Sequence, residues 1–375
     1  MPSTRRPIAA VAALLASWFA LPAAAADDVV TVATYNVEHF QSHFYAHELQ
    51  QKLSKEKQAD SDLKEMLYQL RHGNDEDNWE TAQVIADPAV NPDVLVIEEG
   101  CTQDNLEFFN KRWLEGAYAT VMTFPTNTGE RNQHLNMLLK PGFKVLKRLD
   151  KYRDEPDPTQ PERKLFARGP AFCLVQTPSG YAFWVGVTHQ KSKLIGFGRE
   201  EEAALRQQLA GQPKAEIAAK VVAARNAAGK ATAEWRNREA TRTHAIMKEL
   251  AAGGDSDDVL LLGDMNDSVG KDEYEELAGA DAIDLLVGPP ADGFALATKS
   301  LVDAKAISFG GYDRDQYRSL IDHAVATPAM KDQILGVTVF QGGLAKVASD
   351  HFPVVLKVKC DPAKPTAATA AKPEK

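Results

Sequence analysis

A short apolar run that ends in acidic and amide side chains constrains this chain more than any other feature. Residues 259–268 read VLLLGDMNDS. An unbroken apolar run of this length predicts a strand buried on both faces, whose end delivers polar groups to a pocket. Asp264 and Asn266 are two positions apart, so an extended backbone would place both on one face, and Gly263 would let the backbone approach a bound group. The alternative is a strand that runs into an ordinary Asp/Asn-rich turn.

Several other predicted strands end in polar side chains in the same way. Residues 29–37 (VVTVATYNV), 93–100 (DVLVIEEG) and 183–188 are apolar runs of strand length, and 172–175 with 183–188 predicts a β-hairpin. Two later strand-like runs each carry an Asp-His pair. The polar residues at these strand ends are Asn36, Glu98, Glu99, His189, Asp322, His323, Asp350 and His351.

The remaining chain predicts helices and loops that surround these strands. Apolar residues at helical spacing predict one or two amphipathic helices over residues 47–70 and another over 81–86. A long Ala- and Glu-rich stretch over 199–250 predicts helix with breaks at 211–213 and at Gly229, and the Pro- and charge-rich segment 150–163 predicts an exposed loop.

The N-terminus has the pattern of a processing segment. Arg5 and Arg6 precede an apolar run over residues 8–21, and four alanines follow Pro22. This order predicts a signal peptide cleaved after Ala26, and hence a secreted or periplasmic protein without stable membrane insertion. An uncleaved membrane anchor would need a longer apolar run. The Pro/Ala/Lys-rich tail over 361–375 predicts disorder.

Composition and charge exclude few functions. With 375 residues, 44% of them hydrophobic, the chain can build one large domain, which we place at residues 27–360. The formal net charge of -9 becomes -11 without the two signal-peptide arginines, so only a local basic groove could bind nucleic acid. Cys101, Cys173 and Cys360 show none of the paired spacings of metal-binding cysteines. Two of them could form one disulfide and leave one thiol over, and we propose no cysteine nucleophile.

Taken in chain order, six fragments resemble the motifs of the endonuclease/exonuclease/phosphatase superfamily, also called deoxyribonuclease-I-like. They are TYNV, DVLVIEEG, GVTHQKS, LLLGDMND, SLIDH and SDHFPV, and together they extend over residues 29–359. The resemblance implies an α+β fold of four layers, an α/β/β/α sandwich in which helices flank two packed mixed β-sheets. It also implies a hydrolase that cleaves a phosphoester with Mg²⁺, or with Mn²⁺ or Ca²⁺.

The resemblance assigns a metal site to one group of these residues. Glu99 would be the first metal ligand, with Asn36 and Asp350 beside it, and Arg168 is a weaker candidate for orienting Glu99. The residue types suit the chemistry independently, because Mg²⁺ prefers oxygen ligands and keeps several waters. One or two carboxylates and a substrate phosphate therefore suffice to hold it.

The second group would act on the phosphate and on the attacking water. By resemblance, Asp264 orients or deprotonates the water, and Asn266 holds the water or a phosphate oxygen. His351, paired with Asp322, would polarise the phosphate or assist the leaving group, because a carboxylate partner fixes the imidazole tautomer and favours its charged form. His189 would contact another phosphate oxygen.

Four departures from the family pattern qualify the resemblance. Glu98 replaces the usual glutamine before the metal glutamate and adds a negative charge, and His323 replaces the more usual aromatic residue after Asp322. Where abasic-site nucleases have a tyrosine, this chain offers Asn136, which counts against that activity. The segment 194–235 is longer than usual and is either a substrate-covering insertion or an inert one.

These observations favour an exported, monomeric phosphodiesterase or nuclease that hydrolyses a P–O bond by in-line attack of water. One alternative is a phospholipid phosphodiesterase of the sphingomyelinase-like kind, or a phosphatase, acting on a lipid head group or small phosphoester. Another is a non-catalytic extracellular binding module. A basic groove formed by Lys191, Lys193, Arg131 and Arg168 would favour nucleic acid, and an apolar rim would favour lipid.

Overall fold

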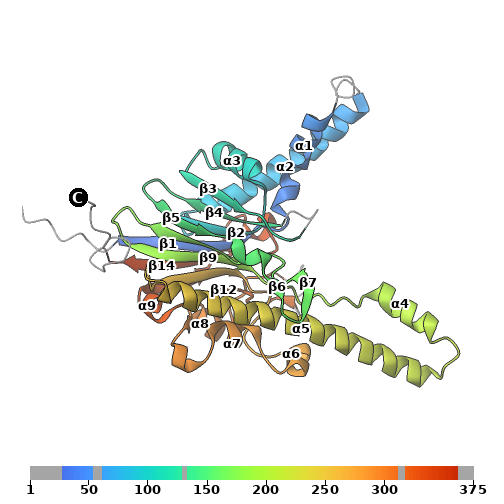
Figure 1. Ribbon diagram of the computed structural model, residues 1–375. Coiled ribbons are helices and arrows are strands. Elements are labelled where there is room, and N and C mark those ends of the chain that lie inside the picture. Colours follow the sequence, from blue (N-terminus) through green and yellow to red (C-terminus); the bar gives the residue numbers. More distant parts are fainter. Residues whose placement is uncertain (1–27, 54–60, 129–132, 311–316, 362–375) are drawn as a thin grey trace, which may run out of the picture.

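The computed structural model describes residues 28–53, 61–128, 133–310 and 317–361, and it confirms the four-layer architecture. Two six-stranded sheets pack face to face, and helices cover their outer faces (Figure 1). The predicted signal peptide (1–26) and the predicted tail from residue 362 onward lie outside the described residues. No helix in the described part of the chain is long and apolar enough to cross a membrane.

The first sheet carries the N- and C-terminal strands of the domain. Its spatial order is β13 (Ile334–Val339), β14 (Val354–Cys360), β1 (Asp28–Asn36), β2 (Val94–Gly100), β4 (His134–Leu139) and β3 (Thr120–Phe124). β1 and β2 are parallel, with Asn36 opposite Glu98. Because parallel strands end at the same sheet edge, this register brings Asn36 to the glutamates that end β2.

The second sheet is built from the middle of the chain. Its order is β11 (Ala295–Leu296), β12 (Asp322–Ala326), β10 (Val259–Asp264), β9 (Ala182–His189), β8 (Ala171–Gln176) and β5 (Lys144–Leu149). β9 runs parallel to β10 with His189 opposite Asp264, and β12 runs antiparallel to β10 with Asp322 opposite Asp264. Three of the predicted site residues therefore share one register position across neighbouring strands.

The central strands β2, β9 and β10 are buried on both faces, as their apolar runs predict. Side chains such as Val32, Val96, Val187 and Leu262 are fully buried in the layer between the sheets. A second apolar cluster fills the space between the first sheet and its helices, and a third lies between the second sheet and its helices. Burial of these side chains is the main stabilising contribution to the sandwich.

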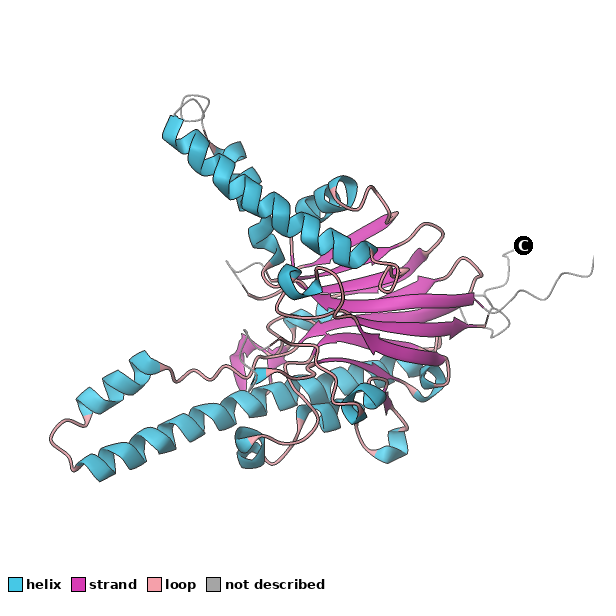
Figure 2. Cartoon of the chain, turned by 180° about the vertical axis from the view of Figure 1, so that it is seen from behind, coloured by secondary structure: helices cyan, strands magenta, loops and turns pink. Residues whose placement is uncertain are grey.

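The helices form the two outer layers and two projections. On the side of the first sheet lie α1 (Tyr45–Lys52), α2 (Ser61–Ala86) and α3 (Gln103–Arg112), and the outer part of α1 and α2 extends away from the sheets (Figures 1 and 2). The long helix α5 (Lys214–Ala252) lies beside the second sheet, and its N-terminal part projects outward with α4 (Arg199–Gln208). The short helices are α6 (Glu273–Ala278), α7 (Ala282–Val287), α8 (Lys299–Asp303), α9 (Pro328–Lys331) and α10 (Ala345–Ala348).

Some local predictions were wrong for identifiable physical reasons. Residues 81–86 continue α2 and do not form a separate helix. The predicted break at 211–213 separates α4 from α5, but α5 passes through Gly229 without interruption. A Cβ atom on Gly229 would lie 2.2 Å from the ring of Tyr274, so this glycine serves close packing of α6 against α5.

The segment 150–163 is more than an exposed loop. It forms a 3-10 turn η4 (Lys151–Asp154), and β6 (Pro156–Asp157) pairs with β7 (Gln160–Lys164). Asp157 is buried there, where its carboxylate accepts hydrogen bonds from Arg163 at 2.5 Å and from Arg238 of α5 at 3.1 Å. Most of the segment is exposed, as predicted, but it forms regular structure and its charge at Asp157 is buried and paired. The three cysteines are buried free thiols, so no disulfide forms.

Candidate active site

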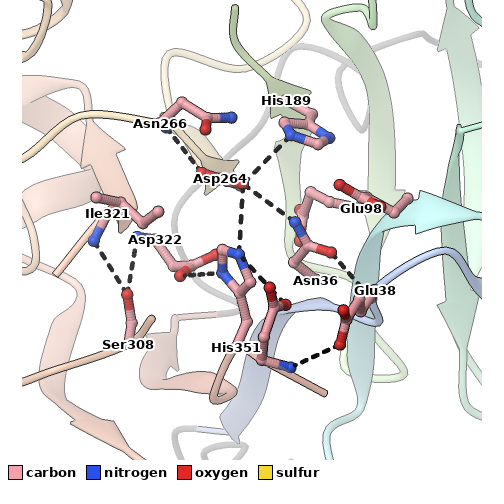
Figure 3. A network of polar contacts seen from close by, with 12 residues as sticks. Asn36, Glu38, Glu98, His189, Asp264, Asn266, Ser308, Ile321, Asp322 and His351 are labelled. Carbon is pink, nitrogen blue, oxygen red and sulfur yellow. Dashed lines mark hydrogen bonds and ion pairs between the residues drawn. The ribbon is translucent and has the colours of Figure 1, made fainter. Parts of the chain in front are cut away.

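Polar ends of strands from both sheets meet around the carboxylate of Asp264 (Figure 3). One oxygen, Oδ2, accepts a hydrogen bond from Asn36 Nδ2 of the first sheet at 3.0 Å and lies 3.2 Å from His189 Nε2. The other oxygen accepts from the backbone N–H of Asn266 at 2.7 Å. Burial alone would raise the pKa of Asp264, but the His189 contact, the charge of His351 and the Asn266 N–H hold it below its usual range.

Asn266 reaches this carboxylate through a turn, and not by the extended geometry expected from its spacing. β10 ends at Asp264, and Asn266 has a φ of 49°, in the left-handed region. Its side-chain Nδ2 donates to the backbone oxygen of Gln190 at 3.1 Å. A Cβ atom on Gly263 would lie 1.9 Å from the carbonyl oxygen of Thr188, so this glycine allows β10 to pack closely against β9.

Asp322 and His351 form a buried pair beside Asp264. Asp322 Oδ2 lies 2.8 Å from His351 Nδ1, and His351 Nε2 lies 3.8 Å from Asp264 Oδ2. Burial disfavours the charged imidazole, but Asp322, Asp264 and Asp350 outweigh it and raise the pKa of His351 to about 10. Ser308 Oγ accepts the backbone N–H groups of Ile321 and Asp322 at 3.0 Å and so fixes the start of β12. The predicted pairing of Asp322 with His351 is therefore present.

His189 is a buried partner of Asp264. Burial and the charge of Arg168 lower the pKa of His189, so the neutral ring donates from Nε2 to the Asp264 carboxylate. We assign the proton of the neutral His189 ring to Nε2 because that nitrogen faces the Asp264 carboxylate. Its Nδ1 atom is buried and has no hydrogen-bond partner among the described residues. His189 thus has one ring nitrogen on Asp264 and an acceptor nitrogen left over.

Strand ends of the first sheet contribute further carboxylates to the site. Asp350 N–H donates to Glu38 Oε2 at 3.2 Å, and Glu38 N–H donates to Asn36 Oδ1 at 3.1 Å. The pKa of Asp350 is raised to about 7. Burial is the largest cause, and the negative charges of Glu38, Glu99 and Asp264 raise the pKa further. We call Glu38, Glu99 and Asp350 the acidic edge.

Glu99 is directed by a bulge at the end of β2. The pairing of β2 with β4 shifts between Ile97 and Gly100, and Glu99 has a φ of 53°. Its carboxylate accepts the backbone N–H of His39 at 3.0 Å and lies 3.1 Å from His39 Nδ1. Burial opposes ionisation, but His189, His39 and Arg168 together lower the pKa of Glu99.

Glu98 does not supply the extra charge expected of it. The side chain is fully buried, and Thr34 Oγ1 lies 2.7 Å from its Oε1 atom. Burial, reinforced by Asp322 and Asp264, raises the pKa of Glu98 well above its usual range. Its neutral form has the shape and polarity of the glutamine that it replaces in the family pattern.

Two other departures prove to be structural. The Asn136 side chain bonds to both the N–H and the carbonyl of Cys101, each at 3.0 Å, and so holds the chain that leaves β2. His323 is fully buried between Thr298 Oγ1 at 2.7 Å and the Leu320 carbonyl at 3.1 Å, and burial lowers its pKa to about 4. Neither side chain carries out chemistry in this arrangement.

The residues of the predicted basic groove are engaged in other contacts. Arg168 is buried and donates to the Gln190 carbonyl at 2.6 Å and to Gln133 Oε1 at 3.2 Å. Lys193 forms ion pairs with Asp267 at 2.7 Å and Asp272 at 2.9 Å. Arg131 lies outside the described residues. The positive charge of Arg168 nevertheless helps to lower the pKa of Glu99.

Sequence reasoning missed the part that α5 takes in supporting the site. Glu239 is buried and accepts the backbone N–H of Ala167 at 3.3 Å and that of Lys191 at 2.6 Å, on the two segments that flank Arg168 and His189. One turn earlier, buried Arg236 lies 2.6 Å from Glu275 and 3.4 Å from Asp267, the residue after Asn266. A charged residue in a predicted helix gives no signal of such contacts, because they depend on tertiary packing.

A sandwich of two mixed sheets with acidic, amide and imidazole groups at one edge defines the class to which the chain can be compared. No family model matches the sequence, and no curated protein matches it significantly. Solved structures do match. An endonuclease/exonuclease/phosphatase family protein from Bacteroides thetaiotaomicron has a TM-score of 0.53 at 15% identity, over 90% of this chain and 96% of that chain.

Two further structures are similar over nearly their whole length. A mannosyl-6-phosphatase from Bacteroides thetaiotaomicron has a TM-score of 0.51 at 15% identity, over 88% of this chain and 99% of that chain. A truncated TDP2 from Caenorhabditis elegans has a TM-score of 0.50 at 14% identity, over 88% of this chain and 98% of that chain. The chain therefore has the endonuclease/exonuclease/phosphatase fold, as its motifs indicated.

Proposed function

We propose that this chain is a divalent-metal-dependent phosphoesterase that hydrolyses a P–O bond by attack of water, and that it acts after export and removal of residues 1–26. The observation that carries the proposal is the arrangement around Asp264. An ionised carboxylate, a charged imidazole and a group of further carboxylates meet where strands of both sheets end. Phosphoryl transfer requires such positioned charges more than it requires covalent chemistry.

The acidic edge fits a magnesium ion better than the Asp264, Asp322 and His351 cluster does. The candidate ligand atoms of that cluster lie within 4.8 Å of one another, but Asp322 already pairs with His351, whose raised pKa keeps the ring protonated and unable to bind a cation. Glu99 and Asp350, with the Asn36 amide oxygen, offer the oxygen ligands that Mg²⁺ prefers. When bound there, the metal would neutralise charge on the phosphate oxygens.

The protein's own groups divide the remaining work. Asp264, ionised and held by three donors, orients the water and accepts its proton. The His351 imidazolium, kept charged by Asp322, donates from Nε2 to a phosphate oxygen or to the leaving oxygen. Neutral His189 fixes Asp264, and the Asn266 amide is available to the water or to the phosphate.

The contacts of the basic residues bear on the substrate. Lys193 is neutralised by two carboxylates and Arg168 is buried, so a groove that follows a nucleic-acid backbone gains little support from them. We therefore favour a small phosphoester over a nucleic acid. The similar mannosyl-6-phosphatase is consistent with a small substrate on this fold.

The test is hydrolysis of bis-p-nitrophenyl phosphate and p-nitrophenyl phosphate by purified residues 27–375, with Mg²⁺ or Mn²⁺ and then with EDTA. Asp264→Ala serves as the site variant, and Lys111→Gln, on the exposed end of α3, as the surface control. We expect metal-dependent turnover that the control retains and that Asp264→Ala loses. A folded, metal-supplied protein that hydrolyses neither ester, nor nucleic acids or phospholipids, would support the non-catalytic binding module instead.

A further inference from the structure

Residues 194–235, which we call the arm segment, begin and end beside one buried carboxylate. The arm segment contains α4 and the N-terminal part of α5, and its outer part projects away from the sheets (Figure 2). Lys193, the residue before it, places Nζ 2.7 Å from Asp267 Oδ1. Arg236, the residue after it, places Nε 3.4 Å from Asp267 Oδ2. Both ends of the arm segment therefore contact the residue that follows Asn266.

The surroundings of Asp267 are charged and largely closed to solvent. Asp267 and Glu275 are fully buried, and Arg236 is 1% exposed. Arg236 Nη2 lies 2.6 Å from Glu275 Oε1, and Lys193 Nζ lies 3.6 Å from the same oxygen and 2.9 Å from Asp272 Oδ2. Removing either cation would leave a buried carboxylate without a partner, which costs more than the loss of a surface ion pair. We call Lys193, Arg236 and Asp267 the arm clamp.

The position of Asn266 depends on contacts on both sides of it. An asparagine adopts a left-handed φ such as its 49° only where neighbouring contacts favour it. On one side, its backbone N–H donates to Asp264 at 2.7 Å. Its side-chain Nδ2 donates to the Gln190 carbonyl at 3.1 Å, and Gln190 N–H donates to the Asp264 carbonyl at 3.0 Å. On the other side, the arm clamp holds Asp267 and so adds a further link between the segments that follow β9 and β10.

We propose that Lys193 and Arg236 are positioning residues that act through Asp267 on Asn266, so that both ends of the arm segment set the geometry of the site. The proposal deepens the proposed function and rests on it wherever activity is the readout. Displacement by about 1 Å of a group that orients a reactant can lower a rate by about 10²-fold, so loosening the arm clamp should lower kcat.

The activity test asks whether Lys193 acts through Asn266, with bis-p-nitrophenyl phosphate as the substrate. Lys193→Met should lower kcat about tenfold and change KM by less than about twofold. In the Asn266→Ala background, the same substitution should lower kcat no further, because the group through which it acts is gone. Lys193→Arg keeps the positive charge and should retain most of the kcat. Equal losses from Lys193→Met in both backgrounds would overturn the proposal.

The matched control is a lysine–aspartate pair near the other end of β10. Lys147 Nζ of β5 lies 2.6 Å from Asp255, which precedes β10, whereas Asp264 ends that strand. Lys147→Met should leave kcat unchanged, and a loss as large as that of Lys193→Met would overturn the proposal. Arg236→Lys tests the arm clamp from its second end and should show the same dependence on Asn266.

Nuclear magnetic resonance separates this proposal from the proposed function. The side-chain NH₂ resonance of Asn266, identified by its loss in Asn266→Ala, should shift or broaden in Lys193→Met and stay in place in Lys147→Met. This result would support the arm clamp even in a preparation that hydrolyses no ester, where the phosphoesterase proposal alone fails. An unchanged resonance in Lys193→Met would overturn the arm clamp and leave the phosphoesterase proposal in place.

Discussion

The two sheets contribute side chains of different kinds to the same site. The second sheet brings Asp264 and His189, which lie 3.2 Å apart, and Asp322, which lies 2.8 Å from His351 of the segment that leads into β14 of the first sheet. The first sheet brings the acidic edge, where burial and then the neighbouring negative charges raise the pKa of Asp350. Under the proposed function, Asp264 and His189 of the second sheet would orient the water and accept its proton, whereas the acidic edge beside the first sheet would receive a cation.

The largest expected effect separates these two roles directly. Asp264→Asn should lower kcat by about 10³-fold, because it removes the proton acceptor, and should shift the midpoint of metal activation only a few-fold. Glu99→Gln should raise that midpoint about tenfold or more, because it removes a charged ligand. Metal titrations of both variants on bis-p-nitrophenyl phosphate provide the measurement. If the two variants shift the midpoint equally, the division between the sheets is wrong.

A double-mutant cycle on Asp322, which begins β12, and His351, which precedes β14, should sharpen the comparison where the two sheets meet. Asp322→Asn and His351→Gln should each lower kcat by about 10²-fold. The kcat of the double variant should be no lower than that of the less active single variant, because the pair acts as one unit. The readout is kcat for the four proteins under saturating metal. Multiplicative losses would mean that Asp322 and His351 act independently.

Stability at acidic pH should depend on the buried His323 of β12. Its pKa is about 4 in the folded protein, against about 6.5 in the unfolded chain, so its contribution is present above pH 6.5 and is lost as pH falls through 4. Between pH 7 and 4.5, the stability advantage of the unchanged protein over His323→Asn should shrink by about 2 kcal/mol. Urea unfolding at both pH values measures this, with the exposed His72→Asn as control. A pH-independent difference would contradict the assignment.

The smallest expected effects compare a helix on each side of the sandwich. A Cβ atom on Gly73 in α2 would meet no atom within 4 Å, whereas one on Gly229 in α5 would meet the Tyr274 ring. Gly73→Ala should therefore stabilise the protein by about 0.5 to 1 kcal/mol, and Gly229→Ala should destabilise it by about 1 to 3 kcal/mol. Thermal and urea unfolding of the two variants measure these changes in the free energy of unfolding. Equal changes of the same sign would show that α5 and α6 do not pack as described.

Sequence reasoning found the site because its residues end buried strands. Asn36, His189 and Asp264 each follow an apolar run that is itself the local signal, and parallel pairing then brings them together. The neutral state of Glu98 could not be predicted, because it depends on burial from all sides. The left-handed turn at Asn266 was missed for a similar reason, since spacing alone does not show where β10 ends. The signal peptide remains a prediction.

The contacts of α5 have a consequence for how the molecule opens. Glu239 and Arg236 lie within one turn of α5. Glu239 accepts the backbone N–H of Lys191, two residues after His189, and Arg236 lies 3.4 Å from Asp267, the residue after Asn266. A local opening that frees this turn would release both segments together. Amide hydrogens of residues 190–191 and 266–268 should then exchange with solvent as one cooperative unit, slowed together by anything that steadies α5. This turn of α5 and the segments that follow His189 and Asn266 thereby share a single local stability.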